Sequence, residues 1–364
     1  MPRALFMTNQ FFSFAGAELT VLELAEEFAS RGWECIIKAA VVGMPLSYRA
    51  FSAKIEVSAL LEDIVVDDFD FVWCQHGTIA NVDFQSLSGK SHRPFLVSAH
   101  LSPYLALEKI LHPYTGELAD LIVANSKETA KALPSWLNSE IIVSGNPAPR
   151  YFFRQREYRK DIERILCVSN HLPGELAHVL LHFERNLNIN VTHIGVGSEG
   201  RRVKPEDIIA ADVVITIGKS VQYALASRTP VYLYDHFGGD GWLTPENISD
   251  QAAFNFSGRP DNRKLTSDDI LKELSADYSD VARITASLTD SDIAKFHLSL
   301  FVDNLIERIT TPRPPLNYSE FDERGMDVAN LQIKLHQATL RQKYGLTTSD
   351  MWSKPSLDSY FGGR

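Results

Sequence analysis

The chain has 364 residues, of which 45% are hydrophobic and 23% charged, with a net charge of −10. These values are typical of folded globular domains, and the length is sufficient for two of them. The acidic balance argues against nucleic acid as the main partner, and no apolar run reaches the roughly 20 residues of a membrane span.

The first residues, MPRALFMTNQ, lack the apolar core and cleavage site of a signal peptide, and they fit a first strand. The chain contains three cysteines, each in or beside an apolar strand-like run: Cys35, Cys74 and Cys167. We therefore expect buried, reduced thiols in a protein that is cytoplasmic, or peripheral to the inner face of a membrane.

Residues 1–150 alternate between strand-like and helix-like segments. A helix is predicted over Gly16–Ser30, because apolar residues recur on one face, and the loop Asn9–Ala15 precedes it. Apolar runs predict strands at Ala4–Thr8, Glu34–Val42, Phe69–Cys74, Pro94–Ser98, Leu121–Asn125 and Ile141–Val143. This βαβ rhythm predicts a doubly wound α/β domain.

Prolines at Asn146–Pro149 interrupt the rhythm, and we expect a charged linker over 151–162. A second α/β domain is predicted over 163–311. Its first elements are the strand Ile165–Ser169, the helix Pro173–Phe183, the strand Asn190–Ile194 and the helix Pro205–Ala211. A proline cluster at 312–315 then precedes a predicted helix, Phe321–Lys343, and a loosely ordered tail, Ser349–Arg364; together they form a last segment, 312–364.

The most informative stretch of the second domain is Asp212–Arg259. An apolar strand, Asp212–Ile217, runs into a helix opened by Lys219 and Ser220. A second strand ends at Asp235 and leads into a glycine-rich loop built on Gly238, Gly239 and Gly241. Parallel strands whose carboxyl ends feed tight polar loops form a ligand crevice, so we expect a phosphate-bearing small molecule there.

Lys219 and Ser220 resemble the end of a P-loop, but the pattern needs a glycine where Val213 stands. A lysine and a hydroxyl at a helix N-terminus can still contact a diphosphate, although Ser220 can equally be a simple N-cap. The segment Gly195–Gly200 matches the dinucleotide glycine pattern, but it neither forms the first turn of its domain nor opens a helix. A nicotinamide cofactor is therefore disfavoured, and Arg201 would at most face a base or a phosphate.

Two residues at the first predicted strand–helix turn, Gly16 and Ala17, stand at a helix N-terminus, which either binds an anion or is a packing turn. His76 and His100 each follow an apolar strand. Such a histidine either contacts a hydroxyl or phosphate in the cleft or is structural.

Metal sites receive little support from the sequence. His178 and His182 lie one helical turn apart without a third ligand, which favours a solvated helix face. Asp235 and Asp240 flank the glycine loop, but loop carboxylates commonly cap turns, so we predict no metal.

Several stretches resemble the GT-B glycosyltransferases, near the large retaining family that uses sugar nucleotides. They occur in the family's order over roughly residues 1–310: GAELTVLELAEEFASRGWE, ADLIVANSKETAKAL, ILCVSNHLPGEL and ADVVITIGKSVQYALASRTPVYLYD. A bacterial subgroup also has DHFGG followed by NFSGR. The resemblance implies two Rossmann-like domains facing a cleft, with the acceptor in the first, the donor in the second, and the C-terminal helix crossing back.

The implied activity is transfer of a sugar from a nucleotide diphosphate sugar to a carbohydrate or lipid-linked acceptor in bacterial polysaccharide biosynthesis. Retention at the anomeric carbon, a metal-independent mechanism and the lack of a cofactor other than the donor substrate follow from the resemblance. His100 is the predicted catalytic contact to the reacting sugar, and Gly16, Ala17 and His76 the predicted acceptor or phosphate contacts. The predicted donor-binding residues are Asn170, Arg201, Lys219, Ser220, Tyr223, Asp235, Gly238, Gly239, Asp240, Gly241, Glu246 and Asn247.

One departure from the family concerns its pair of donor-site glutamates, whose places are taken by Ile215 and Tyr223. Either the donor is held through Asp235, Glu246 and Asn247, or the chain is an inactive pseudo-glycosyltransferase that serves as a binding or scaffold subunit. A sugar-nucleotide epimerase on the same fold is a further alternative. The sequence leaves open the base, the sugar, the acceptor, the oligomeric state, and whether exposed aromatics touch a membrane.

Overall fold

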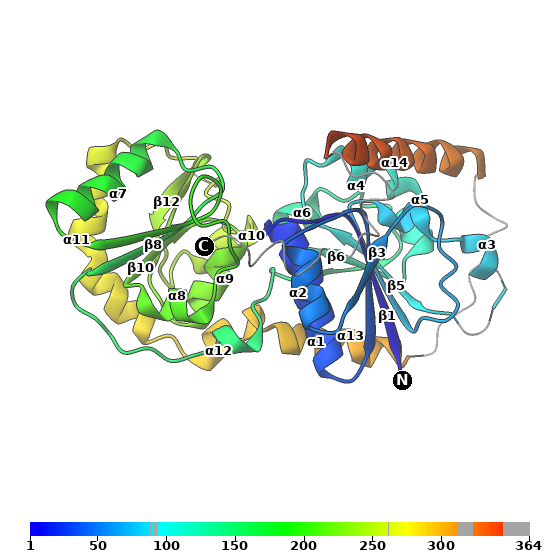
Figure 1. Ribbon diagram of the computed structural model, residues 1–364. Helices are drawn as coiled ribbons and strands as arrows, with labels where there is room; N and C mark the ends of the chain where they lie inside the picture. The colour runs from blue at the N-terminus through cyan, green and yellow to red at the C-terminus, as the bar shows by residue number, and fades with distance from the viewer. Residues whose placement is uncertain (88, 91–92, 261, 312–322, 345–364) are drawn as a thin grey trace. The chain divides into compact units, whose positions relative to one another are not determined.

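The computed structural model describes residues 1–87, 89–90, 93–260, 262–311 and 323–344 (Figure 1). The chain divides into two compact units. The first unit comprises 1–98 and 105–120 together with the described part of 312–364, and the second comprises 99–104 and 121–311. Two sheets with helices packed on them confirm the predicted α/β class.

The first sheet has seven strands in the order β3-β2-β1-β4-β5-β6-β7. The strands are β1 (Arg3–Phe11), β2 (Glu34–Val42), β3 (Glu56–Ala59), β4 (Phe71–Gln75), β5 (Phe95–His100), β6 (Leu121–Ala124) and β7 (Glu140–Val143). β1 pairs in parallel with both β2 and β4. The chain therefore leaves β1 first to one side and then to the other, which places a topological switch point between β1 and β4.

The helical segments that belong to this sheet follow its strands in the βαβ rhythm. They are α1 (Gly16–Ser30), α2 (Leu46–Ser52), η1 (Thr78–Asn81), α3 (Phe84–Leu87), α4 (Ala106–Ile110), α5 (His112–Leu118) and α6 (Lys127–Lys131). The predicted helix Gly16–Ser30 is confirmed. β1 extends three residues beyond the predicted Thr8 to Phe11, so the predicted loop Asn9–Ala15 is shorter than expected.

The second sheet has five strands in the order β12-β11-β10-β8-β9. The strands are β8 (Arg164–Val168), β9 (Asn190–Ile194), β10 (Val213–Thr216), β11 (Val231–Asp235) and β12 (Gly238–Trp242). β8 pairs in parallel with β9 on one side and β10 on the other, so a second switch point lies between β8 and β10.

Helices connect these strands and close the second unit. They are η2 (Arg150–Phe152), α7 (Gly174–Asn186), α8 (Pro205–Ala210), α9 (Lys219–Ala226), α10 (Ile248–Ala253), α11 (Ser267–Ala286), α12 (Asp290–Ile293), η3 (Ala294–Phe296) and α13 (Leu298–Ile309). The amphipathic helix α11 caps its own N-terminus through Thr266, whose hydroxyl accepts the N–H of Asp269.

The prediction of a glycine-rich loop at Gly238–Gly241 is wrong, because these residues form the edge strand β12, antiparallel to β11. The register shifts between Leu233 and Asp235, which marks a β-bulge. A Cβ atom at Gly239 would lie 1.8 Å from the carbonyl oxygen of Leu233. The glycines are therefore required by close backbone packing within a hairpin.

The C-terminal helix α14 (Glu323–Lys343) packs on the first unit. Its buried side chains Met326, Ala329 and Ile333 join a hydrophobic core with residues of β1 and β4. The predicted return of this helix to the first domain is thus confirmed. The predicted tail Ser349–Arg364 and the proline cluster 312–315 lie outside the described residues, and the proposed domain boundaries stay a prediction.

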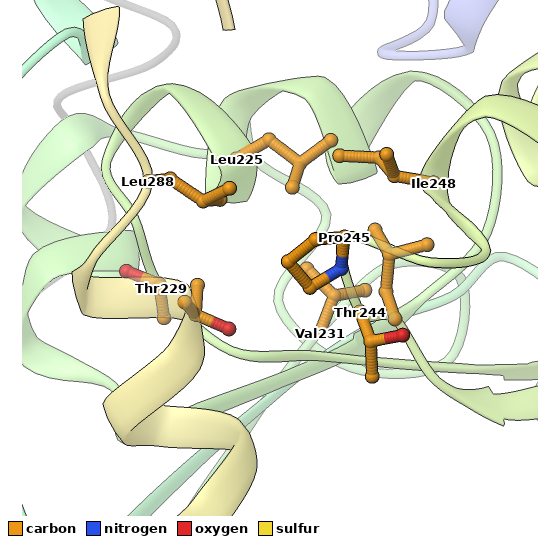
Figure 2. Close-up of a pocket in the computed structure, with 9 residues that line it drawn as sticks. Leu225, Thr229, Val231, Thr244, Pro245, Ile248 and Leu288 are labelled. Carbon is orange, nitrogen blue, oxygen red and sulfur yellow. The ribbon is translucent and has the colours of Figure 1, made fainter. Parts of the chain in front are cut away.

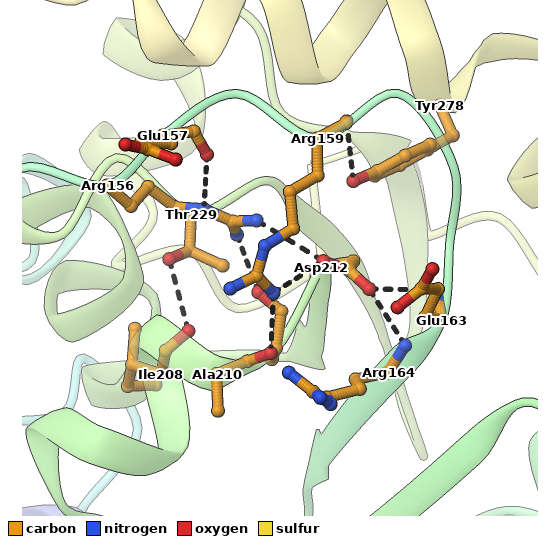
Figure 3. A network of polar contacts seen from close by, with 11 residues as sticks. Arg156, Glu157, Arg159, Glu163, Arg164, Ile208, Ala210, Asp212, Thr229 and Tyr278 are labelled. Carbon is orange, nitrogen blue, oxygen red and sulfur yellow. Dashed lines mark hydrogen bonds and ion pairs between the residues drawn. The ribbon is translucent and has the colours of Figure 1, made fainter.

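A polar network fastens the segment that leads into the second sheet (Figure 3). Asp212, whose side chain is fully buried, lies at the start of β10. One of its carboxylate oxygens accepts bonds from Arg156 at 3.3 Å and Arg159 at 2.9 Å. The other accepts the backbone N–H groups of Glu163 and Arg164, each at 2.8 Å. The segment predicted as a linker is thus bound to the second unit at Asp212, and also through bonds from Arg156 and Arg159 to the carbonyl oxygens of Ala211 and Ala210.

Candidate functional site

A fixed carboxylate lies at the carboxyl ends of β8 and β11. The Oγ of Ser169 donates to Oδ1 of Asp235 at 2.9 Å, and the same oxygen accepts the backbone N–H of His236 at 2.7 Å. Ser169 Oγ in turn accepts the N–H of His171 at 3.0 Å. Because β8 borders the switch point, this edge of the second sheet is the candidate ligand site.

Two histidines that the sequence reading missed stand beside this carboxylate. The rings of His171 and His236 lie 4.8 Å apart at a steep angle, 63°. His171 is exposed and His236 half-buried, and Nδ1 of His236 lies 3.4 Å from Oδ1 of Asp235. The N–H group of an imidazole can donate a hydrogen bond to a ligand oxygen, and the ring can serve as an acid or base in proton transfer.

Two cations flank the same turn, and the sequence reading assigned neither to the site. The ammonium group of Lys264 donates to the carbonyl oxygen of His236. The guanidinium of Arg259 lies 5.8 Å from the ring of Phe237, which is 40% exposed. Arg259 is the last residue of the NFSGR stretch, which could have identified it as a candidate site residue. Its contact with Phe237 could not be predicted from the sequence.

Arg259 is held from its other side by residues that follow β5 and β6. Its Nη2 pairs with Glu128, and the guanidinium lies 5.4 Å from the ring of Tyr104. The hydroxyl of Tyr104 donates to Glu128 at 2.9 Å, and this hydrogen bond raises the pKa of the tyrosine. Nε of Arg259 is buried and has no hydrogen-bond partner among the described residues. The guanidinium therefore keeps one donor unused.

Asn170 follows Ser169 and is exposed at the carboxyl end of β8, so the structure does bring this predicted donor residue to the edge that carries Asp235. Gly195 packs against the same turn. Its φ is +149°, and a Cβ atom would lie 1.8 Å from the carbonyl oxygen of Ser169. The first glycine of the dinucleotide-like pattern thus serves close backbone approach.

Gly195→Ala is expected to lower the free energy of unfolding by about 1–3 kcal/mol, because the added methyl group must displace the backbone of Ser169. Chemical denaturation followed by circular dichroism measures the change. Gly200→Ala is the matched control, since nothing lies within 4 Å of a Cβ atom there. Equal stability of both variants would contradict this role of Gly195.

Lys219 and Ser220 begin α9 at the carboxyl end of β10, as predicted. The ammonium group of Lys219, whose residue is only 8% exposed, donates to the carbonyl oxygen of Pro147 at 3.3 Å. One turn along, Gln222 donates to the carbonyl oxygen of Gly145 at 3.0 Å. Lys219 thus fastens the proline-containing segment after β7 in this structure. Diphosphate contacts from Lys219 or Ser220 stay a prediction.

The β12 residues differ from a phosphate-binding loop. The N–H of Gly239 donates to the carbonyl oxygen of Arg263 at 3.1 Å, and Gly238 and Gly241 pair with β11. The Oδ2 of Asp240 accepts a bond from Gln251 at 2.5 Å. The amide of Gly239 is therefore already used within the protein, which weakens the predicted cradle of main-chain N–H groups.

Two predicted donor residues, Glu246 and Asn247, follow the antiparallel strand β12, and the structure therefore places them near the start of β11. Asn247 locks a turn by accepting the N–H of Thr244 and donating to Trp242, each at 2.9 Å. β11 rises by roughly 3.3 Å per residue, so this turn is separated from Asp235 by about 13 Å along the strand. The structure does not bring Glu246 and Asn247 together with Asp235.

A small pocket lies at that opposite end (Figure 2). Its lining is mostly apolar, with three threonines and no charged residue: Leu225, Thr229, Val231, Leu243, Thr244, Pro245, Ile248, Thr285 and Leu288. Val231 begins β11, so the pocket is remote from the carboxyl edge that carries Asp235. We assign it to packing.

Tyr223 and Arg201, two further predicted donor residues, are engaged within the fold. The Tyr223 ring is 1% exposed and stacks on Phe152 with a centroid distance of 4.1 Å. Arg201 forms a bidentate pair with Asp207 at 2.6 and 2.9 Å, and its pKa is raised chiefly by that hydrogen bonding. Their roles in donor binding stay predictions.

In the first unit, the turn that leads into Gly16 and Ala17, the predicted anion site, holds a carboxylate of the chain itself. Glu18 accepts the N–H groups of Phe12 at 2.8 Å and Ser13 at 2.6 Å. Burial raises the pKa of Glu18, while these bonds oppose the shift. A ligand phosphate would meet a carboxylate here, which disfavours anion binding at this turn.

His76 lies at the switch point of the first sheet, where β4 ends, in a left-handed conformation with φ +57°. Its Nδ1 lies 3.4 Å from Oγ1 of Thr8, and its carbonyl oxygen accepts a bond from Asn9 at 3.1 Å. Burial and the neighbouring His336 lower the pKa of His76 to about 4, so the ring is neutral at neutral pH. Strained polar residues at such points are often functional.

His100 is the last residue of β5 and is 3% exposed, with its carbonyl oxygen accepting the N–H of Asn125 at 3.0 Å. It leads into the segment that ends at Tyr104, the tyrosine beside Arg259.

His178 and His182 are exposed on α7, as predicted for a solvated face. Within the described residues, no group of three histidine, cysteine or carboxylate side chains has the arrangement of a metal site.

Among the described residues, no helix is both long enough and apolar enough to span a bilayer. No known family model matches the chain, and no curated protein matches it in sequence. Its structure is similar to solved structures. One is a spinosyn forosaminyltransferase, with a TM-score of 0.50 at 13% identity over 85% of this chain and 100% of that one.

Two further neighbours have the same architecture. A putative UDP-N-acetylglucosamine 2-epimerase from Listeria monocytogenes gives a TM-score of 0.52 at 12% identity, over 86% of this chain and 98% of that one. An alpha-glucosyltransferase in complex with UDP and a 13-mer DNA gives 0.51 at 10% identity, over 85% and 99%. At such identities the likeness shows the fold alone, and that fold is GT-B.

Proposed function

We propose that the chain is a glycosyltransferase that uses a nucleotide diphosphate sugar as donor. The observation that carries the proposal is the cluster of polar and cationic groups at the switch-point edge of the second sheet, on a GT-B fold. Asp235 presents a fixed carboxylate to hydroxyl groups of a ribose or sugar, and Arg259 and Lys264 stand beside it.

In the proposed reaction, the bond between the anomeric carbon and the diphosphate breaks while an acceptor hydroxyl forms the new glycosidic bond. Negative charge develops on the leaving nucleoside diphosphate, and preorganised cations and imidazole N–H groups stabilise it. Arg259 and Lys264 supply the positive charge, and His171 and His236 supply the imidazole N–H groups. The acceptor proton leaves with a base of the site or with the diphosphate.

The remaining assignments are part of the proposal and rest on the sequence resemblance. These are a carbohydrate or lipid-linked acceptor, retention, independence of metals and of cofactors, a bacterial polysaccharide pathway, and a cytoplasmic or membrane-peripheral location. His100 is proposed as the contact to the reacting sugar, and His76 as an acceptor or phosphate contact.

A sugar-nucleotide epimerase is the second candidate, because one structural neighbour is described as a putative 2-epimerase. Such a reaction moves a proton at a sugar carbon and requires an acid–base pair in the cleft, for which His171, His236 and Asp235 are the available groups. NMR analysis of the products from one nucleotide sugar separates the two reactions. An isomerised sugar that is still attached to its nucleotide would replace transfer as the conclusion.

Calorimetric titration with uridine, guanosine and thymidine diphosphates is expected to show binding of at least one, with a Kd in the micromolar range. Asp235→Asn should weaken this binding by about tenfold, because a charged acceptor for hydroxyl groups is lost. Glu246→Gln is the matched control at the opposite end of β11 and should leave the affinity unchanged. No binding of any diphosphate at millimolar concentration would contradict the proposal, whereas binding without turnover would favour the pseudo-glycosyltransferase.

A further inference from the structure

Helix α14, drawn in red-brown in Figure 1, carries apolar residues on two opposite faces. Its inner face, with Met326, Ala329 and Ile333, is buried in the first unit. Its outer face carries Val328, Leu331 and Leu335, which are 58%, 57% and 58% exposed. The spacing of these three residues places them along one side of the helix.

Further exposed apolar residues lie in a segment beside the helix. Lys334 pairs with Asp63 at 2.9 Å, and this contact brings the segment after β3 alongside α14. Leu61 and Val65 in that segment are 41% and 56% exposed. Together with the leucine stripe, these residues give five exposed apolar side chains on α14 and the segment beside it, and apolar residues gathered in this way mark an interaction site more often than residues scattered singly. We call this set of residues the α14 face.

The charges on this face favour one kind of occupant. Asp327 and Lys334 lie two helical turns apart on the same flank of the leucine stripe, and both are exposed. If a second α14 packs antiparallel across the stripe, Asp327 of each copy meets Lys334 of the other, whose ammonium group then lies between Asp327 and its partner within the chain, Asp63. Val328 of each copy then lies opposite Leu335 of the other, with the two Leu331 side chains at the centre.

We infer that the α14 face binds a second copy of this chain through a two-fold, antiparallel α14 pair. The pattern is self-complementary, as a two-fold interface requires. An anionic membrane surface fits less well, because Asp327 and Asp63 lie on the same face and would be repelled. Five apolar side chains are far fewer than the roughly 20–30 residues that each partner contributes to a standard interface, so we expect a weak, micromolar dimer.

Sedimentation velocity over a range of micromolar concentrations tests the inference on the full chain. The wild type should shift from monomer to dimer as the concentration rises. Leu331→Glu combined with Leu335→Glu should weaken association by at least tenfold, because each copy then buries two charges. Leu300 on α13 is also an exposed leucine, with 53% of its surface accessible to solvent. Leu300→Glu is therefore the matched control and should dimerise like the wild type.

Charge exchange identifies the partner as a second copy. Asp327→Lys alone and Lys334→Asp alone should each weaken self-association, because like charges then meet across the two-fold axis. Mixing the two variants in equal amounts should restore a dimer. These substitutions lie on the surface, so circular dichroism should show an unchanged fold.

Three results would overturn the inference. One is a monomer at every concentration. Another is a dimer that persists in the Leu331→Glu, Leu335→Glu variant, which would place the interface elsewhere. The third is a monomer that binds vesicles containing phosphatidylserine and loses that binding in the same variant, which would make the α14 face a membrane contact.

Discussion

Asp212→Ala should lower the free energy of unfolding of the second unit by about 3–5 kcal/mol, the range observed when one partner of a buried ion pair is removed. The side chain of Arg156, 4% exposed, would remain buried without its carboxylate. Burial has the largest influence on the pKa of Arg156 and lowers it, so keeping this arginine charged costs free energy. The ion pair with Asp212 offsets that cost. The N–H groups of Glu163 and Arg164 would also lose their acceptor.

Urea denaturation followed by far-ultraviolet circular dichroism measures the loss. Glu206→Ala is the matched control, because its pair with Arg154 is exposed on both sides, 66% and 45%. Such surface pairs contribute about 0–1 kcal/mol. Asp212→Asn retains one acceptor oxygen and should fall between the two. A change for Asp212→Ala no larger than that for Glu206→Ala would show that the network does not hold the segment.

The parallel strands were predictable because buried strands are continuous apolar runs, and those of β2, β8 and β9 were located to within a residue or two. The two switch points depend on the order of the strands in each sheet, which only the structure gives. The pattern of the chain thus predicts that a ligand edge forms at the carboxyl ends of parallel strands. It does not determine which side chains reach that edge, because this depends on the path of the segments that connect the strands.

β12 illustrates this limit. A reading of DHFGGDGW as a phosphate loop is reasonable by composition, since glycines serve both tight loops and close backbone packing. The antiparallel return of β12 carries Glu246 and Asn247 to the far end of β11, and only the structure reveals this. The carboxylate of Glu18 at the start of α1 shows the same limit, because the helix turn looked open to an anion while its own side chain fills it.

Arg259 was missed for a related reason. Its partners Glu128 and Tyr104 are distant in sequence, and no local pattern connects them to NFSGR. Lys219, by contrast, was found at the predicted helix start, but its ammonium group reaches a backbone carbonyl. Sequence position identified the helix terminus correctly and could not tell where a long, flexible side chain would end.

Arg259→Gln should have the largest effect on activity, because Arg259 is one of the two cations of the proposed donor site. We expect kcat to fall by about 10²–10³-fold, the loss typical of removing one preorganised group that stabilises developing charge. The affinity for the nucleoside diphosphate should fall by about tenfold or more, because a charged hydrogen-bond donor is worth about 1.5–3 kcal/mol. Initial rates are measured with the nucleotide sugar whose diphosphate binds best in the calorimetric titration.

Two variants decide whether Arg259 serves the ligand or only the fold. Arg308→Gln removes an arginine that pairs with Glu140, and it should leave both kcat and affinity unchanged. Glu128→Gln removes the partner of Arg259 but keeps the guanidinium, so a ligand-binding role predicts retained or tighter diphosphate binding. If Glu128→Gln and Arg259→Gln instead lose equal stability and leave the affinity unchanged, Arg259 is a structural ion pair, and the cationic part of the proposed donor site must lie with Lys264 and the two histidines.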